Sequence, residues 1–178
     1  VLTALRDRIE ATAAGTRLPD PIAVSYQPVS VELATMPDLV IGRRATQTVV
    51  VKRKWQAAAD VVGLELAAIS GALPTVQPGA HIDVHLSNGL VRQYSVTNGP
   101  GEQLSYVIGV KRDPQSRGGS ALIHDSLREG DIVAISEPRN NFPLRRDALK
   151  TLLIAGGIGL TPLLSMAKAL KRSGLAFE

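Results

Sequence analysis

Short stretches that alternate hydrophobic and polar residues dominate the middle of the chain. The clearest runs from His81 to Leu86, and the Asn88-Gly89 pair that follows is typical of a tight hairpin turn. We expect roughly six strands, separated by turns, over residues 46–51, 61–66, 81–86, 91–96, 104–110 and 131–135. One short helix is expected over residues 120–127. The series predicts a mainly β fold, either an antiparallel barrel or a sandwich.

Toward the C-terminus the alternation gives way to a continuous apolar run over 151–155, which is typical of a strand buried on both faces. Thr161 and Pro162 suit an N-cap and the first position of a helix, and Gly174 suits its end. This is one strand–helix unit of an α/β domain. Because a single unit cannot bury its own faces, we expect the full-length protein to continue past Glu178.

The N-terminal region has a different texture. Residues 2–13 carry apolar side chains at helical spacing, with Gly15 where a helix would end. Residues 17–43 hold several prolines with little periodicity, which indicates an extended linker. The sequence therefore divides into an N-terminal helix and linker, a β domain and the start of an α/β domain, at residues 1–44, 45–148 and 149–178.

Composition narrows the function classes. The chain is 44% hydrophobic and 20% charged, as in soluble globular proteins, and no apolar run approaches the ~20 residues of a membrane helix. The net charge of +4 is spread along a chain with only 3% aromatic residues, so a stacking platform for nucleic acid is not expected. The absence of cysteine excludes a Cys-ligated iron–sulfur cluster within these residues. We expect a cytoplasmic protein with no membrane or nucleic-acid partner.

The first motif with chemical meaning is Arg92-Gln93-Tyr94-Ser95, at the end of an expected strand. Alternate residues of a strand share a face, so Arg92 and Tyr94 are able to meet one flat ligand. A flavin needs an aromatic or apolar contact for its ring, and Arg and hydroxyl donors for its phosphate. The alternative is an ordinary solvated strand face.

The second motif is the loop over 111–120, which contains Arg117-Gly118-Gly119-Ser120 and leads into the short helix. The glycines leave backbone N–H groups accessible, and the start of a helix favours an anion. Arg117 and the Ser120 hydroxyl would complete a phosphate cradle. A flexible basic loop with a serine cap is the alternative interpretation.

The third motif is the turn over 156–162. Gly156, Gly157 and Gly159 permit a dinucleotide to approach the turn between strand and helix. The spacing differs from the Rossmann fingerprint because Pro162 stands where its third glycine would fall. A glycine-rich turn that binds nothing is the alternative.

The remaining ionisable residues suggest no further site. His81 and His85 share a strand face, but no third metal ligand is evident, so we expect solvated histidines and no metal site. His124 is expected to face solvent. The acidic residues are scattered, and no catalytic acid/base pair stands out.

Taken together, collinear motifs give residues 45–178 a resemblance to the phthalate dioxygenase reductase family, which includes vanillate demethylase reductases and the reductase domains of self-sufficient heme-thiolate monooxygenases. The motifs that carry the resemblance are Pro78-Gly79-Ala80-His81-Ile82-Asp83, Arg92-Gln93-Tyr94-Ser95, Val110-Lys111-Arg112-Asp113, Arg117-Gly118-Gly119-Ser120, Pro138-Arg139-Asn140-Asn141-Phe142-Pro143-Leu144 and the turn over 155–162.

The resemblance implies a flavin-binding antiparallel β-barrel of the ferredoxin-reductase type, followed by the first β–α unit of a nicotinamide-binding domain. It implies cofactor binding by Arg92, Gln93, Tyr94, Ser95, Val110, Lys111, Arg117, Gly118, Gly119, Ser120 and Thr161. It implies nicotinamide binding by Gly156, Gly157, Gly159, Thr161 and Pro162. The family uses FMN, and the Arg-Gly-Gly-Ser loop matches its members better than FAD-type relatives.

The activity that the resemblance implies is electron transfer. Hydride passes from NADH or NADPH to the flavin, which then passes single electrons through a 2Fe-2S centre in a domain outside this chain. An oxygenase component, or a fused heme-thiolate or iron oxygenase domain, accepts them. The alternatives are an FAD-type ferredoxin reductase and a non-catalytic flavin-binding fragment of a larger fused monooxygenase.

Overall fold

A computed structural model of the chain describes residues 46–102 and 104–178. These residues lie in one compact unit, Ile41–Glu178. The helix predicted over 2–13 and the linker predicted over 17–43 fall outside the described residues. No helix in the described part of the chain is long and apolar enough to cross a membrane.

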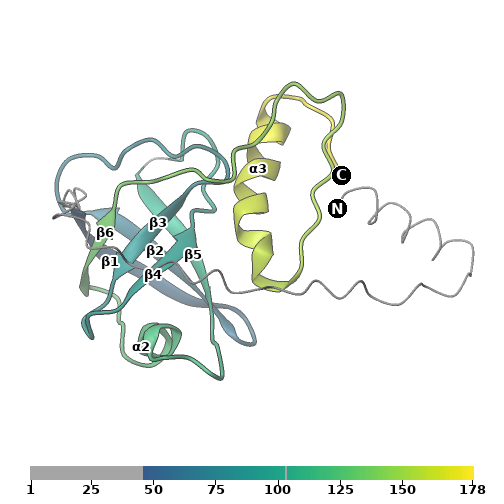
Figure 1. The fold of residues 1–178 in the computed structure, drawn as a ribbon. Helices are drawn as coiled ribbons and strands as arrows, with labels where there is room; N and C mark the ends of the chain where they lie inside the picture. The colour runs from purple at the N-terminus through teal and green to yellow at the C-terminus, as the bar shows by residue number, and fades with distance from the viewer. Residues whose placement is uncertain (1–45, 103) are drawn as a thin grey trace, which may run out of the picture. The chain divides into compact units, whose positions relative to one another are not determined.

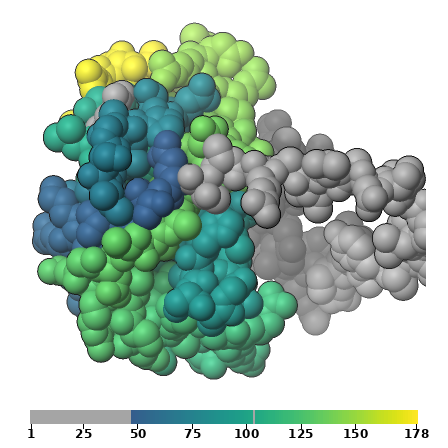
Figure 2. All heavy atoms as spheres, turned by 90° about the vertical axis from the view of Figure 1, so that its left-hand side faces the viewer, coloured from purple at the N-terminus to yellow at the C-terminus, as the bar shows by residue number. Residues whose placement is uncertain are grey.

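An antiparallel sheet of six strands forms the body of this unit (Figure 1). The strands are β1 (Thr46–Ala58), β2 (Val61–Ala68), β3 (His81–His85), β4 (Val91–Ser95), β5 (Ser105–Lys111) and β6 (Ile132–Ser136). Their order across the sheet is β4-β3-β6-β1-β2-β5. The prediction of six strands in a mainly β, antiparallel fold is therefore confirmed. On the face shown in Figure 2, blue residues of β1 adjoin green residues near β6, in agreement with the pairing of these two strands.

The two edge strands of the sheet, β4 and β5, meet at one end only. Val96, directly after β4, bridges Ile108 of β5, and the Thr97 amide donates to the Val107 carbonyl at 2.8 Å. Toward Arg92 and Lys111 no further bridge between the two strands is found in the described residues. The barrel thus closes at one end and leaves a gap at the other.

The core of the barrel is formed by alternate residues of each strand, whose side chains point inward. In β5, Tyr106, Ile108 and Val110 are fully buried, whereas the residues between them face outward. Ile123, from helix α2 (Gly119–Asp125), is also fully buried and joins the same cluster. Each such side chain contributes about 1.5–3 kcal/mol by leaving water. The core therefore holds α2 against the barrel, close to the gap.

The strand predicted over residues 151–155 is not observed. Instead of a strand buried on both faces, they make a single parallel bridge between Thr151 and Phe177. Leu152 and Ile154 are 64% and 72% exposed. A buried strand needs neighbours on both sides, and the described residues supply only the bridge at Phe177.

The C-terminal helix begins earlier than predicted, so Thr161 is not its N-cap. A short 3-10 turn, η1 (Gly157–Gly159), leads directly into α3 (Leu160–Arg172), so Gly159 is the N-cap and Thr161 lies inside the first turn. The Thr161 hydroxyl donates to the Ile158 carbonyl at 2.9 Å instead of capping the helix. Gly174 follows the helix with a positive φ of 66°, as predicted for its end. The short helix α2 covers most of its predicted range.

Tyr106 gives a test of the core. Its hydroxyl donates to the Pro74 carbonyl at 2.6 Å, and burial, with a contribution from the charge of Glu137, raises its pKa to about 12. Tyr106→Phe leaves the carbonyl without its donor and should lower the free energy of unfolding by about 1 kcal/mol. Urea unfolding should show a lower midpoint with an unchanged slope. An unchanged midpoint would mean that water replaces the hydroxyl without cost.

Candidate functional site

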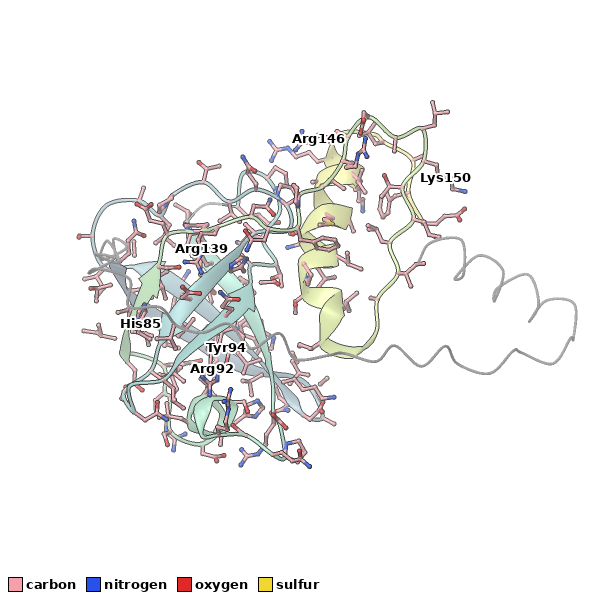
Figure 3. All side chains as sticks on the ribbon, viewed as in Figure 1. His85, Arg92, Tyr94, Arg139, Arg146 and Lys150 are labelled. Carbon is pink, nitrogen blue, oxygen red and sulfur yellow. The ribbon has the colours of Figure 1, made fainter. Side chains whose placement is uncertain are left out.

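A cavity of about 240 Å³ lies where β4 and β5 separate. Its walls come from β4, the end of β5, the following loop and the first turn of α2. The lining residues are Arg92, Tyr94, Lys111, Asp113, Gln115, Ser116, Arg117 and Ser120. Figure 3 shows the labelled Arg92 and Tyr94 at the end of the barrel near α2. The structure thus brings together five residues that the resemblance assigned to cofactor binding.

Hydrogen bonds within the loop hold this wall of the cavity in shape. The Asp113 amide donates to the Ser120 hydroxyl at 3.1 Å, and the Asp113 carboxylate accepts from the Gln115 amide at 2.9 Å. The Gly118 amide donates to the Ser116 hydroxyl at 3.1 Å. Gly118 has a φ of 97°, a conformation that strongly favours glycine. The loop is therefore preorganised around the cavity.

Arg92 and Gly119 depend on each other. A Cβ atom at position 119 would lie 2.7 Å from the Arg92 Nε and 3.0 Å from its Cγ. The absence of a side chain at Gly119 therefore lets the Arg92 side chain lie across the start of α2. The Arg92 guanidinium also donates to the Val91 carbonyl at 2.9 Å. A fixed guanidinium is suited to an anionic oxygen ligand.

Tyr94 supplies the apolar wall. It is partly buried and packs against the core cluster. Burial raises the pKa of its phenol, and the charge of Arg92 offsets this only in part, so the hydroxyl stays protonated at neutral pH. The ring offers a flat, neutral surface beside three cationic side chains, Arg92, Lys111 and Arg117. An aromatic surface next to clustered cations fits a flat ring that carries a phosphate.

His124 of α2 corrects the expectation that it faces solvent. Its ring Nε2 lies 2.9 Å from the Val110 carbonyl oxygen, in a partly buried position. The side chain of Val110 is fully buried in the core, its carbonyl is engaged by His124, and the residue does not line the first cavity. The sequence offered no sign of this contact, because positions 110 and 124 meet only when α2 folds back on β5.

Gln93 and Ser95 lie apart from Arg92 and Tyr94. They line a second cavity of about 220 Å³, together with Gly79, His81, Asn141, Phe142 and Pro162. Successive residues of a strand point to opposite faces, so one four-residue motif serves two cavities. Pro162 brings the start of α3 to this second cavity.

A partly buried ion pair lies beside the second cavity. The Arg139 Nη2 donates to the Asp83 Oδ1 at 2.7 Å, and the two side chains are 23% and 16% exposed. Burial would raise the pKa of Asp83, but hydrogen bonds from Arg139 and Gln93 and the charge of Arg139 lower it on balance. Burial, reinforced by Arg139, lowers the pKa of His81. His81 is thus not the fully solvated histidine that we expected, and it stays neutral at pH 7.

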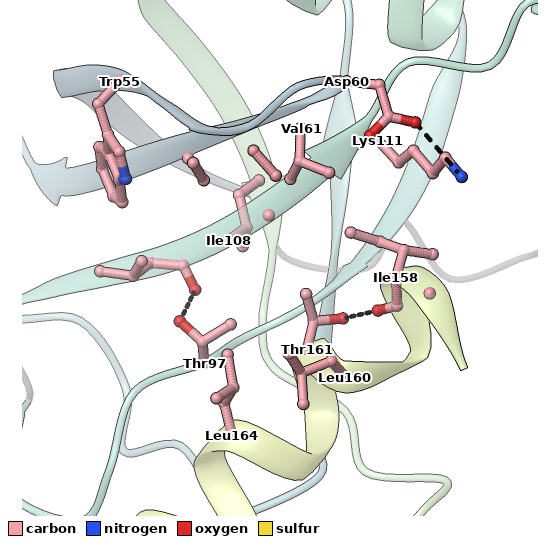
Figure 4. A pocket seen from close by; sticks show the side chains of 16 residues that line it. Trp55, Asp60, Val61, Thr97, Ile108, Lys111, Ile158, Leu160, Thr161 and Leu164 are labelled. Carbon is pink, nitrogen blue, oxygen red and sulfur yellow. Dashed lines mark hydrogen bonds and ion pairs between the residues drawn. The ribbon is translucent and has the colours of Figure 1, made fainter. Parts of the chain in front are cut away.

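The third cavity, of about 480 Å³, lies between the outer face of β5 and the start of α3 (Figure 4). It is mostly apolar, and Gly157 and Thr161 line it together with Trp55, Ile158 and Lys111. Lys111 also lines the first cavity, so the two are neighbours; its ammonium lies 3.3 Å from the Asp60 carboxylate. Gly109 lets α3 approach, since a Cβ there would lie 3.1 Å from the Thr161 methyl carbon.

Some site residues were not anticipated, and some anticipated residues lie elsewhere. Gln115 and Ser116 line the first cavity, and their position in the glycine-rich loop was the available signal. Trp55 lines the third cavity, a position that no motif indicated. Gly156 and Gly159 flank the lining residue Gly157 without lining a described cavity themselves.

The chain is similar to known oxidoreductases. It is 54% identical over 122 residues to a vanillate O-demethylase oxidoreductase of a Pseudomonas species, and 47% identical over 123 residues to the phthalate dioxygenase reductase of Burkholderia cepacia. Each match covers 68% of this chain and 38% of the relative, so the chain spans about two fifths of the length of these relatives. No protein-family model matches the chain.

Comparison with solved structures points to the same group of proteins. The phthalate dioxygenase reductase structure, described as modular for electron transfer from pyridine nucleotides to a 2Fe-2S centre, matches with a TM-score of 0.72 and 42% identity, over 74% of this chain and 41% of that one. An intact type IV self-sufficient cytochrome P-450 monooxygenase matches with a TM-score of 0.72 and 36% identity, over 75% of this chain and 17% of that one.

The fold indicates a class, since the barrel matches the flavin-binding fold of phthalate dioxygenase reductase. Over the segment that it spans, the chain is homologous to phthalate dioxygenase reductase and the vanillate O-demethylase oxidoreductases. The resemblance found in its motifs is thereby confirmed.

The Asp83–Arg139 pair gives a prediction that depends on pH. The pKa of Asp83 is lower in the folded chain than its ordinary value of 3.8, so its stabilisation is present above 3.8 and is lost as the pH falls through the lower folded value. Asp83→Asn should therefore cost about 1–3 kcal/mol of unfolding free energy at pH 7. The difference from wild type should shrink in acid. A difference that does not change with pH would contradict the assigned role of the carboxylate.

Proposed function

We propose that this chain is the flavin-binding part of an NAD(P)H-dependent reductase, with FMN as its flavin, that supplies electrons to an oxygenase. The observation that carries the proposal is the first cavity, where Arg92, Lys111 and Arg117 surround a small volume beside the Tyr94 ring. Clustered cations with a serine hydroxyl suit a phosphate, and the neighbouring ring suits an isoalloxazine.

FMN is favoured over FAD by the charge of the first cavity. The terminal phosphate of FMN carries close to two negative charges at neutral pH, whereas each phosphate of the FAD pyrophosphate carries about one. Arg92, Arg117 and Lys111 outnumber the one carboxylate, that of Asp113, around this cavity of about 240 Å³, and the two arginines suit the more highly charged group. The phosphate would be held by Arg92, Arg117, Ser120 and the backbone of Gly118 and Gly119, with the ring extending past Tyr94 toward Lys111.

The third cavity would receive the electron donor. It adjoins the first cavity at Lys111, and its apolar lining includes Thr161 and Gly157 at the start of α3. We propose that the nicotinamide of NADH or NADPH approaches the flavin from this side. The turn that carries Gly156, Gly159 and Pro162 would hold the donor, and Ser95 and Gln93 would face the flavin from the second cavity.

A bound flavin would accept a hydride and return electrons one at a time. The chain's own residues would fix the ring and phosphate, and the apolar cavity would keep water from the reacting face. We propose that the electrons leave through a 2Fe-2S centre outside this chain to an oxygenase, either a separate component or a fused heme-thiolate or iron oxygenase domain. The proposed setting is the cytoplasm, with domain boundaries near residues 44 and 148.

The phosphate assignment is tested by Arg117→Ala. The variant should bind FMN more weakly by about 1–3 kcal/mol, because a charge-assisted hydrogen bond is lost. Riboflavin, which lacks the phosphate, should bind the variant and the wild type equally. Fluorescence titration with both flavins measures the difference. A matching loss of riboflavin affinity would place Arg117 against the ring instead of the phosphate, and FAD released from the purified protein would overturn the choice of FMN.

The ring assignment is tested by Tyr94→Ala. Loss of the aromatic contact should weaken FMN and riboflavin binding to a similar extent, by about 1 kcal/mol or more. Flavin fluorescence should rise in the bound state, because a nearby tyrosine that quenches it has been removed. Arg53→Ala, remote from the first cavity, serves as the control. Equal affinities in Tyr94→Ala and wild type would show that Tyr94 is only a wall of the barrel.

A further inference from the structure

Lys54 of β1 makes an unusual set of contacts with helix α2. Its Nζ donates to three backbone carbonyls, those of Ile123 at 2.7 Å, His124 at 2.7 Å and Leu127 at 2.8 Å. An ammonium has three donors, and here all three are used. Its backbone amide also donates to the Glu129 carboxylate at 2.7 Å, which ties the next loop to the same strand.

Two of these acceptors, Ile123 and His124, are among the last four carbonyls of α2, and Leu127 lies two residues past its end. The last four carbonyls of a helix have no acceptor role within it, and a lysine at this end both donates to them and complements the local negative potential. Burial, followed by the charge of Arg128, lowers the pKa of Lys54. The hydrogen bonds to the three carbonyls stabilise the charged ammonium and offset this cost of burial.

Helix α2 needs such an anchor. It has only seven residues, and an isolated helix of that length is unstable in water. The Arg112–Asp125 ion pair also holds it, but both side chains are largely exposed, where salt screens such pairs. His124 joins α2 to the Val110 carbonyl. Lys54 is the only one of these tethers that reaches α2 from β1.

The position of α2 determines the shape of the first cavity. Ser120 lies in its first turn and lines the cavity, and Arg92 lies across Gly119. Lys54 holds the C-terminal end of α2, so freeing that end would let the helix tilt, which would move the Ser120 hydroxyl and displace the Arg92 guanidinium. It would leave Tyr94, on β4, in place.

We propose that Lys54 is a positioning residue for the phosphate: it touches no ligand, but it fixes α2 so that Ser120 and Arg92 converge on one anion. This inference rests on the proposed function, since it takes the first cavity as the phosphate site.

The test compares Lys54→Met with Lys52→Met. Lys52 lies on the same strand and its ammonium pairs with Glu65 at 2.9 Å, away from α2, so the two variants lose the same charge. We expect the FMN affinity of Lys54→Met to fall roughly fivefold to tenfold, the size of one ordinary hydrogen bond, because Lys54 acts on the ligand only through α2. Riboflavin affinity should stay at the wild-type value. Lys52→Met should bind both flavins as the wild type does.

The ratio of the FMN and riboflavin dissociation constants decides the outcome. An equal ratio in Lys54→Met and Lys52→Met overturns the role of Lys54, whereas a wild-type protein that binds both flavins equally overturns the phosphate site itself. If Lys54→Met does not fold, Lys54→Gln is used, because its shorter, uncharged side chain reaches fewer carbonyls. In the Arg117→Ala background the effect of Lys54→Met should be smaller than in wild type, as expected for residues that act on one ligand group. Full additivity would contradict the proposal.

Discussion

The separation of β4 and β5 is the constraint on which the candidate site depends. The two edges of the sheet join at Val96 and Ile108 and then diverge, so the barrel seals its core at one end and leaves strand edges without partners at the other. Unpaired strand edges require hydrogen-bonding partners, and α2 with its preceding loop covers part of this gap. The first cavity occupies the remainder, and its polar lining follows from that position.

Glycines make the close contacts around the gap possible. Gly119 allows Arg92 to cross the start of α2, and Gly109 allows Thr161 to approach β5. Both contacts join segments that are distant in sequence. Because the packing is tight, the polar groups are held in fixed positions. A larger side chain at either glycine would not be tolerated. The polar first cavity and the apolar third cavity adjoin at Lys111 on β5, and the second cavity lies at Gln93 and Ser95 of β4.

The similarity to known reductases covers 68% of the chain. The relatives at 54% and 47% identity are a vanillate O-demethylase oxidoreductase and a phthalate dioxygenase reductase. Leu152 and Ile154 stay exposed among the described residues, although apolar side chains of this size favour burial. The electron-transfer proposal accordingly joins local chemistry found in this chain to a longer path found in its relatives.

The sequence by itself determined the six strands, the hairpin at Asn88-Gly89 and the motifs of the first cavity, because strand alternation and glycine turns are local properties. Its motifs also singled out Arg92, Tyr94, Arg117 and Ser120, and the structure places these four residues around one cavity. It could not show that Gln93 and Ser95 serve a different cavity, that His124 turns inward or that Lys54 anchors α2. The run over 151–155 was misjudged for the same reason: whether an apolar stretch becomes a buried strand depends on neighbours, and only the tertiary structure specifies which segments meet.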